Sequence, residues 1–233
     1  MDTRLRGRAR KDEVDAVPEC LVTLTDPSGS ASEAYRSLRT SLLYAVVDAP
    51  PKVVLITSPG SADGKSVTCA NLAVVLAQAD KEILVIDGDL RQPTMHSIFR
   101  ERNVAGVVNV LAGENEVSEA WKTIIPGLKM MSAGPVPPNP AELLSSVRFA
   151  ELVGQARQQF DYVLIDSPPT GVVSDPMIIA AQADAVLLVL DANGTSKGSL
   201  RKAIRDLEAV GAKVLGTVMN KAPVGEPGLH YGR

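Results

Sequence analysis

Short apolar runs alternate with longer amphipathic stretches along most of the chain. The apolar runs predict strands at 53–57, 83–87, 128–132, 162–166, 185–190 and 213–219. The amphipathic stretches predict helices at 32–47, 66–79, 141–158, 175–182 and 197–210, with a short helix at 106–112. Strands that alternate with helices form right-handed crossovers and a parallel sheet covered on both faces. The order therefore predicts an α/β protein with a three-layer, Rossmann-like α/β/α fold.

The two ends of the chain differ from this regular middle. Residues 1–30 are polar, and five basic residues fall within the first eleven. We expect a flexible lead-in with a solvated charge, and attraction to anionic lipid is the alternative. Ser32 is a suitable N-cap for the helix that follows. Residues 222–233 are rich in Pro and Gly and predict a flexible tail. The folded domain is therefore expected at 31–221.

The most informative segment runs from Val53 to Ser66. It is an apolar run, then a loop of small residues ending in Gly64-Lys65-Ser66, then a helical pattern. This order is typical of a phosphate-binding loop, in which backbone N–H groups surround phosphate oxygens. Lys65 would neutralise the β- and γ-phosphates, and the Ser66 hydroxyl would ligate Mg²⁺. The usual first glycine is Pro59 here, and an ordinary strand-to-helix turn is the alternative. We interpret the segment as a nucleotide-binding site.

Acidic residues follow two other predicted strands. Asp87 and Asp89 come after the run at 83–87, and Asp166 ends the run at 162–166. Ligands of open α/β sheets bind at the carboxyl ends of the strands, so these acids are expected to meet the phosphate loop. Carboxylates there can hold Mg²⁺ or accept a proton from an attacking hydroxyl. For Asp184, by contrast, a loop salt bridge or a cap is the better interpretation.

Composition narrows the class of protein. The net charge of −3 argues against a nucleic-acid partner. Cys20 and Cys69 show no metal or redox spacing, and we expect free thiols in a reducing cytosol. No apolar run approaches the roughly 20 residues that span a bilayer. Membrane association would have to come through a partner or through surface charge.

Together these segments resemble the bacterial tyrosine kinases of capsule and exopolysaccharide synthesis, within the MinD/ParA-like P-loop ATPases. The Gly64-Lys65-Ser66 loop resembles the family's Walker A motif. The segment Asp87-Gly-Asp89-Leu-Arg91-Gln-Pro resembles its A′ motif, and Asp166-Ser-Pro-Pro its Walker B motif. Two further segments resemble the polysaccharide group: Glu33-Ala-Tyr-Arg36-Ser-Leu-Arg39, and the Pro-Pro-Asn-Pro stretch within 133–144.

The resemblance implies an ATP- and Mg²⁺-dependent protein-tyrosine kinase, working at the inner face of the cell membrane with a polysaccharide co-polymerase adaptor. It implies rings assembled through Glu33, Arg36 and Arg39. The implied catalytic residues are Lys65, Asp87, Asp89 and Asp166, and the implied metal ligands are Ser66, Asp87 and Asp166. The expected nucleotide-binding residues are Gly60, Ser61, Ala62, Asp63, Gly64, Lys65, Ser66, Val67, Arg91 and Asn220.

The chain departs from the family pattern at two places. Ala62 stands where the loop more often has a glycine, which predicts a stiffer loop. The family's tyrosine-rich tail is reduced to Tyr231, so little self-phosphorylation is expected. A MinD/ParA-type ATPase is one alternative, but its second loop lysine is Gly60 here. A catalytically weak, nucleotide-dependent scaffold that gates export is the other alternative.

Overall fold

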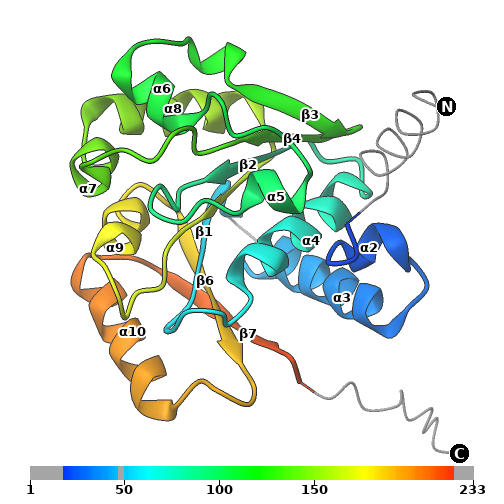
Figure 1. The fold of residues 1–233 in the computed structure, drawn as a ribbon. Helices are drawn as coiled ribbons and strands as arrows, with labels where there is room; N and C mark the ends of the chain where they lie inside the picture. The colour runs from blue at the N-terminus through cyan, green and yellow to red at the C-terminus, as the bar shows by residue number, and fades with distance from the viewer. Residues whose placement is uncertain (1–17, 47–49, 223–233) are drawn as a thin grey trace, which may run out of the picture.

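A computed structural model describes residues 18–46 and 50–222, and these form one seven-stranded sheet between two layers of helices (Figure 1). The strand order is β3-β4-β2-β5-β1-β6-β7. The strands are β1 (Val53–Thr57), β2 (Ile83–Asp87), β3 (Trp121–Ile125), β4 (Leu128–Met131), β5 (Tyr162–Asp166), β6 (Ala185–Asp191) and β7 (Val214–Asn220). All neighbouring pairs are parallel except β3 with β4. The predicted α/β fold is confirmed.

The central strands are apolar on both faces because each face is covered by helices. Side chains on one face pack under α6 (Val107–Ala112), α7 (Pro140–Leu144), α8 (Val147–Gln159), α9 (Asp175–Ala180) and α10 (Lys197–Ala209). Side chains on the other face pack under α2 (Val22–Thr25), α3 (Ser30–Tyr44), α4 (Lys65–Ala77) and α5 (Met95–Ile98). A 3₁₀ turn, η1 (Val117–Glu119), precedes β3. Two buried cores therefore hold the sheet rigid, as in other parallel sheets.

The six predicted strands are present, and β3 is an additional edge strand. It pairs antiparallel with β4 through a turn in which Gly127 adopts a φ of +78°. Its side chains are half-buried or exposed, in contrast to the fully buried strands β1, β2 and β5. A half-exposed strand shows a weaker apolar pattern, which is why the pattern at 121–125 predicted none.

The predicted helix at 141–158 is two helices. Residues Pro140–Leu144 form α7, and a second helix, α8, begins after Ser146. The Ser146 side chain accepts the N–H of Phe149, so it caps a new helix instead of continuing the old one. The apolar periodicity continues across the break, which is why the pattern predicted one helix.

Residues 18–30 are folded onto the domain, and the prediction of a flexible lead-in is wrong for them. Leu21 is buried, and the Thr23 N–H and hydroxyl both donate to Asn71 of α4. The N-cap of α3 is Gly29, not Ser32. Ser32 is buried within the first turn and donates to the Val22 carbonyl. The predicted boundary at residue 31 therefore lies inside an ordered segment. Residues 1–17 and the predicted tail beyond 222 lie outside the described residues.

Strand register brings the acidic strand ends together. Asp87 at the end of β2 lies directly opposite Asp166 at the end of β5, and β5 also pairs Asp166 with Ile56 of β1. The phosphate loop leaves β1 immediately after this pair. Three neighbouring strands thus deliver a loop and two carboxylates to one edge of the sheet, as the sequence predicted.

Candidate active site

The segment after β1 is a compact loop that leads directly into α4. Thr57 anchors its start, donating its hydroxyl to the Pro168 carbonyl at 2.8 Å. Gly64 adopts a left-handed φ of +94°, and a Cβ there would lie 1.9 Å from the Asn220 side-chain nitrogen. Only glycine fits this conformation and this space. Helix α4 then begins at Lys65, so its free N–H groups open toward the carboxyl edge of the sheet.

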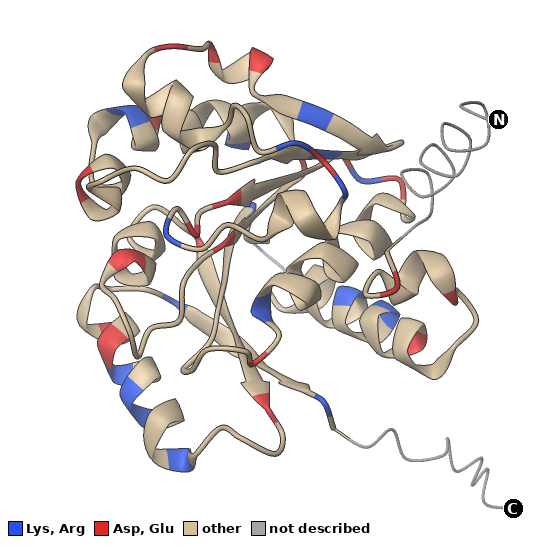
Figure 2. Cartoon of the chain, in the orientation of Figure 1, with Lys and Arg blue, Asp and Glu red and all other residues tan. Residues whose placement is uncertain are grey.

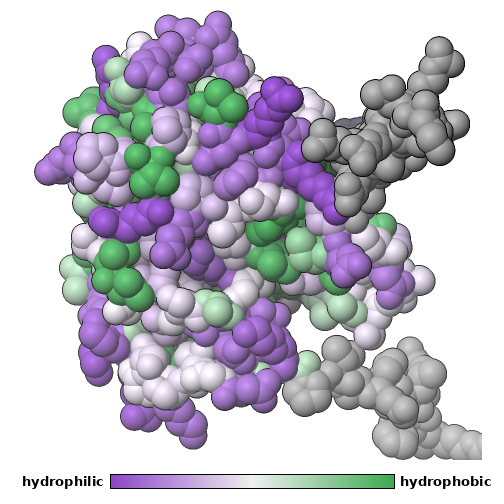
Figure 3. All heavy atoms as spheres, in the orientation of Figure 1, coloured by the Kyte–Doolittle hydropathy of each residue, from purple (hydrophilic) through white to green (hydrophobic). Residues whose placement is uncertain are grey.

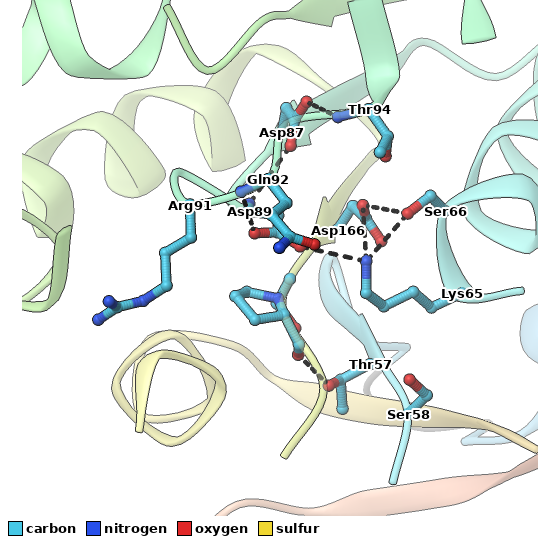
Figure 4. A network of polar contacts seen from close by, with 12 residues as sticks. Thr57, Ser58, Lys65, Ser66, Asp87, Asp89, Arg91, Gln92, Thr94 and Asp166 are labelled. Carbon is cyan, nitrogen blue, oxygen red and sulfur yellow. Dashed lines mark hydrogen bonds and ion pairs between the residues drawn. The ribbon is translucent and has the colours of Figure 1, made fainter. Parts of the chain in front are cut away.

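Lys65 lies at the centre of a polar network with two carboxylates and a hydroxyl (Figure 4). Its Nζ is 3.3 Å from Asp89 Oδ2 and 3.6 Å from Asp166 Oδ2. The same Nζ is 3.1 Å from Ser66 Oγ, which donates to Asp166 Oδ2 at 2.6 Å. These four side chains come from the loop and from two different strand ends. The structure therefore brings four of the predicted site residues into direct contact.

Asp87 holds the neighbouring loop in place. Its Oδ2 accepts the N–H groups of Thr94 and Met95 at 3.1 and 3.0 Å, and its Oδ1 accepts that of Asp89 at 3.3 Å. Asp89 in turn accepts the Gln92 N–H at 3.0 Å. Asp87 is fully buried, so these backbone donors replace water as its partners. The loop at 88–94 is thereby fixed beside the phosphate loop.

Burial sets the charge state of the site. It raises the pKa of Asp87 to about 8, and the nearby Asp166 adds to this rise. It raises the pKa of Asp166 to about 6, although Lys65 and Ser66 act in the opposite direction. Burial opposes the charge on Lys65, but the carboxylates of Asp166 and Asp89 outweigh it and raise the pKa of the ammonium. The site therefore combines a charged Lys65 with two acids that burial makes easier to protonate.

The oxygen ligands of this site suit Mg²⁺. Asp166 Oδ1 is buried and has no hydrogen-bond partner among the described residues. A buried carboxylate oxygen without a partner costs free energy unless a ligand satisfies it. The adjacent Ser66 hydroxyl supplies a second oxygen. No cluster of three or more Asp, Glu, His or Cys side chains within 18–46 and 50–222 forms a complete metal cage. Mg²⁺ needs none, since it keeps waters and binds through one or two carboxylates plus phosphates.

A cavity of about 460 Å³ opens over this network. The phosphate loop lines one part of the cavity, and Gln92, Thr94, helix α5 and Pro169 line another. Of the predicted nucleotide-binding residues, those lining the cavity are Ser61, Ala62, Gly64, Lys65, Ser66 and Val67. The Gly60 N–H is instead bonded to the Asp63 carboxylate at 2.9 Å, which closes the loop on itself.

Four of the predicted nucleotide-binding residues do not line the cavity: Gly60 and Asp63, which bond to each other, and Arg91 and Asn220. Arg91 turns away from Lys65 (Figure 4) and forms a bidentate pair with the buried Asp175, at 2.8 and 3.0 Å. It thus ties the loop after β2 to the start of α9. Asn220 donates its side-chain amide to the Asp63 carbonyl at 2.9 Å, so it contacts the loop from behind.

The sequence analysis missed Asp175, Asp191 and Lys221, all of which brace the site. Asp175 comes nine residues after Asp166, and only the fold brings it to Arg91. Asp191 is the last residue of β6, and Lys221 follows the last residue of the adjacent strand β7. Their side chains form a 2.7 Å ion pair. A strand-end acid and a strand-end lysine are the signal that was available. The predicted salt bridge of Asp184 is confirmed, with Arg157 at 2.7 Å. Asp184 caps no helix, and its carboxylate instead accepts the N–H groups of Lys52 and Val53 at the start of β1.

Both the sequence and the fold of this chain are similar to those of known proteins. The family described as AAA domain matches residues 51–217. Tyrosine-protein kinase YwqD of Bacillus subtilis is 40% identical over 91% of this chain and 90% of its own length. Tyrosine-protein kinase CpsD of Streptococcus agalactiae is 35% identical over 86% of both chains. The solved kinase domain of Escherichia coli tyrosine kinase ETK superposes with a TM-score of 0.84 at 32% identity, covering 88% of this chain and 80% of that one.

Proposed function

The chain belongs to the bacterial tyrosine-protein kinase family within the P-loop ATPases, and we propose that it phosphorylates protein tyrosines with ATP to regulate capsule or exopolysaccharide synthesis. The observation that carries this proposal is the contact of Lys65 and Ser66 with Asp89 and Asp166 beneath an open cavity. Phosphoryl transfer needs such a set: a cation and backbone donors for the phosphates, and carboxylates for Mg²⁺ and for the proton.

The proposed reaction assigns a role to each side chain. The phenolic oxygen of the acceptor attacks the γ-phosphorus, a new O–P bond forms, and the bond to the β-phosphate oxygen breaks. ADP leaves with that electron pair. Ser66 and Asp166 would hold Mg²⁺, with Asp87 beside Asp166, and the ion would offset the negative charge of the phosphates. Asp89 lies beside Lys65 at the cavity wall, and we assign it to accept the phenolic proton.

The partners are part of the same proposal. No helix among residues 18–46 and 50–222 combines the length and apolar character needed to cross a bilayer. We propose work at the inner face of the membrane with a polysaccharide co-polymerase adaptor. We also propose ring assembly through the exposed Glu33 and through Arg36, which is partly buried and also donates to the Pro27 carbonyl at 2.8 Å. Arg39 donates to the Val75 carbonyl at 2.9 Å, so its guanidinium is already engaged within the chain.

A comparison of two variants tests the catalytic assignment. With labelled ATP, Mg²⁺ and a random copolymer of glutamate and tyrosine, wild-type protein should form phosphotyrosine. Asp89→Asn should bind Mg²⁺–ATP but transfer little phosphate, because the proton acceptor is lost. Asp166→Asn should weaken the Mg²⁺ dependence of nucleotide binding itself. Equal transfer by Asp89→Asn and wild type would contradict the role of Asp89.

A further inference from the structure

Asn220, the last residue of β7, and Lys221, which follows it, form hydrogen bonds with two consecutive carbonyl groups of the phosphate loop. Asn220 Nδ2 donates to the Asp63 carbonyl at 2.9 Å, and Lys221 Nζ donates to the Ala62 carbonyl at 2.8 Å. Lys221 Nζ also pairs with Asp191 Oδ2 at 2.7 Å, at the end of β6. The far side of the loop is thus fastened to two strand ends that the nucleotide-binding motif does not include.

These two hydrogen bonds fix the directions in which the neighbouring backbone N–H groups of the loop point. In a trans peptide the C=O of one residue and the N–H of the next point in opposite directions, and the described residues contain no cis peptide. A hydrogen bond that pulls the Ala62 carbonyl backward therefore points the Asp63 N–H forward. The bond to the Asp63 carbonyl does the same for the Gly64 N–H. These are the groups that a phosphate loop presents to its anion.

The two residues joined by the Lys221–Ala62 hydrogen bond both have a strained backbone conformation. Among the described residues, four non-glycine residues have positive φ: Ala62, Asp80, Arg100 and Lys221. Ala62 and Lys221, at φ of 62° and 55°, are the two residues joined by the 2.8 Å hydrogen bond. Each such conformation costs about 1 kcal/mol or more and persists where surrounding contacts impose it. Both partners are therefore held away from their relaxed conformations by the arrangement that they form.

We propose that Lys221 is a positioning residue for the phosphate-binding loop. Through its bond to the Ala62 carbonyl it keeps the Asp63 N–H directed at the β-phosphate of a bound nucleotide, and Asp191 keeps its ammonium in place. Asn220 does the same for the Gly64 N–H. This inference rests on the proposed function only because it requires that the loop bind a nucleoside diphosphate.

The position of Lys221 supports a role beyond simple stability. Its side chain is 47% exposed, and exposed ion pairs contribute about 0–1 kcal/mol to folding. An exposed pair that also bonds a loop carbonyl instead controls the direction of that peptide. Lys202 offers a matched control, because its Nζ pairs with Asp206 Oδ2 at 2.6 Å on α10 and its side chain is 60% exposed. Figure 2 shows α10 on the outer surface, where Lys and Arg residues follow its length.

The test compares affinities for ADP and AMP, since their ratio isolates the contribution of the β-phosphate. Lys221→Met should lower the ratio of the AMP to the ADP dissociation constant about fivefold, corresponding to one weakened hydrogen bond. Lys221→Arg, which keeps a charged donor, should retain most of the ratio. Lys202→Met should leave it unchanged. Asp191→Asn supplies a second variant, and it should lower the ratio by loosening Lys221.

Each outcome has a defined meaning. A reduced ratio in Lys221→Met, with the ratio retained in Lys202→Met, supports the inference. If Lys221→Met lowers the melting temperature but leaves the ratio at the wild-type value, Lys221 is only structural and the inference is overturned. If the variant loses affinity for AMP and ADP equally, the contact acts on the part that the two nucleotides share. The inference is then again overturned. Failure of wild-type protein to bind ADP would instead overturn the proposed function, and the inference with it.

Discussion

Lys65 concentrates positive charge where the phosphates are expected. Its Nζ lies between Asp89 and Asp166, and both carboxylates hold it in the charged state. Lys65→Met should lower nucleotide-dependent phosphoryl transfer at least about 100-fold, as does removal of one electrostatic donor in other enzymes. The apolar cores do not include Lys65, so circular dichroism should show a folded domain. Normal turnover by folded Lys65→Met protein would refute the site assignment.

The acidic pair predicts how the nucleotide-free protein responds to pH. Asp87 has a folded pKa of about 8, far above its ordinary value of 3.8. Below about pH 4 the carboxyl is protonated in both the folded and the unfolded chain. As pH rises, the unfolded chain loses the proton first, so stability should fall until about pH 8. Asp166, with a pKa of about 6, titrates with it as a coupled pair.

Asp87→Asn removes one member of this pair. Its urea-unfolding free energy should depend less on pH than that of wild type between about pH 5 and about pH 8. Its amide nitrogen cannot accept the backbone N–H groups that one Asp87 oxygen accepts, so the variant should be less stable than wild type at low pH, where wild type buries no charge at this position. A steeper pH dependence in the variant would mean that the folded protein does not hold Asp87 protonated.

Gly64 is required by both conformation and space. A Cβ would lie 1.9 Å from the Asn220 side chain, in a backbone with φ of +94°. Gly64→Ala should therefore displace Asn220, cost about 2 kcal/mol of stability and abolish tight ADP binding. Isothermal titration with ADP and urea unfolding measure the two effects. Wild-type values for both would show that the loop relaxes freely at this position.

At the scale of elements, α3 contacts the helix that follows the phosphate loop. Arg39 donates to the Val75 carbonyl near the end of α4, whereas Glu33 and Arg36 form an exposed 2.7 Å pair. Glu33→Ala/Arg36→Ala should therefore reduce self-association with Mg²⁺ and ADP, and it should cost about 1 kcal/mol of stability because Arg36 also donates to the Pro27 carbonyl. Arg39→Ala should lower stability by a similar amount, about 1 kcal/mol, without the same loss of self-association. Sedimentation of the double variant identical to that of an assembling wild type would exclude this surface.

The elements also show how far the sequence predicts the fold. Strands buried on both faces, such as β1, β2 and β5, were predicted from apolar runs, and each lies within a residue or two of its prediction. The pattern failed where burial is partial or where a cap interrupts a continuous periodicity. The edge strand β3 and the Ser146 cap are the two examples. Ser32 failed for a third reason: its hydroxyl bonds the carbonyls of Val22 and Asp26, partners that no local motif indicates.

The same division holds for the site. Gly64, Lys65, Ser66 and the strand-end acids follow from motif and topology, since parallel strands end at one edge. Other side chains support the site through contacts between segments that are far apart in the sequence. Examples are Asp175, which pairs with Arg91, and Lys221, which donates to the Ala62 carbonyl. Residue type alone indicates that these side chains are polar. Their partners are set by tertiary structure.

At the scale of the whole molecule, the surface is mixed. Figure 3 shows apolar residues in separate groups among polar ones, and Val104, Val136 and Val172 are each more than 60% exposed. Among the tyrosines, Tyr162 is 6% exposed on β5 and Tyr35 is partly buried on α3. Tyr44 is 75% exposed, but it is held in the last turn of α3. Tyr231 lies outside the described residues, between His230 and Gly232. We therefore expect low self-phosphorylation, confined to Tyr231, with the main acceptor on another protein.

The fate of the γ-phosphate tests the central claim most directly. Protein is incubated with γ-labelled ATP and Mg²⁺, with and without a cytoplasmic peptide of the adaptor, and label is counted in phosphotyrosine and in inorganic phosphate. Mass spectrometry then locates the modified residues. The account predicts Mg²⁺-dependent phosphotyrosine, mostly on the added acceptor and on Tyr231 within the chain, and none with Lys65→Met. Label found only in inorganic phosphate, or heavy modification of Tyr35, Tyr44 or Tyr162, would contradict it.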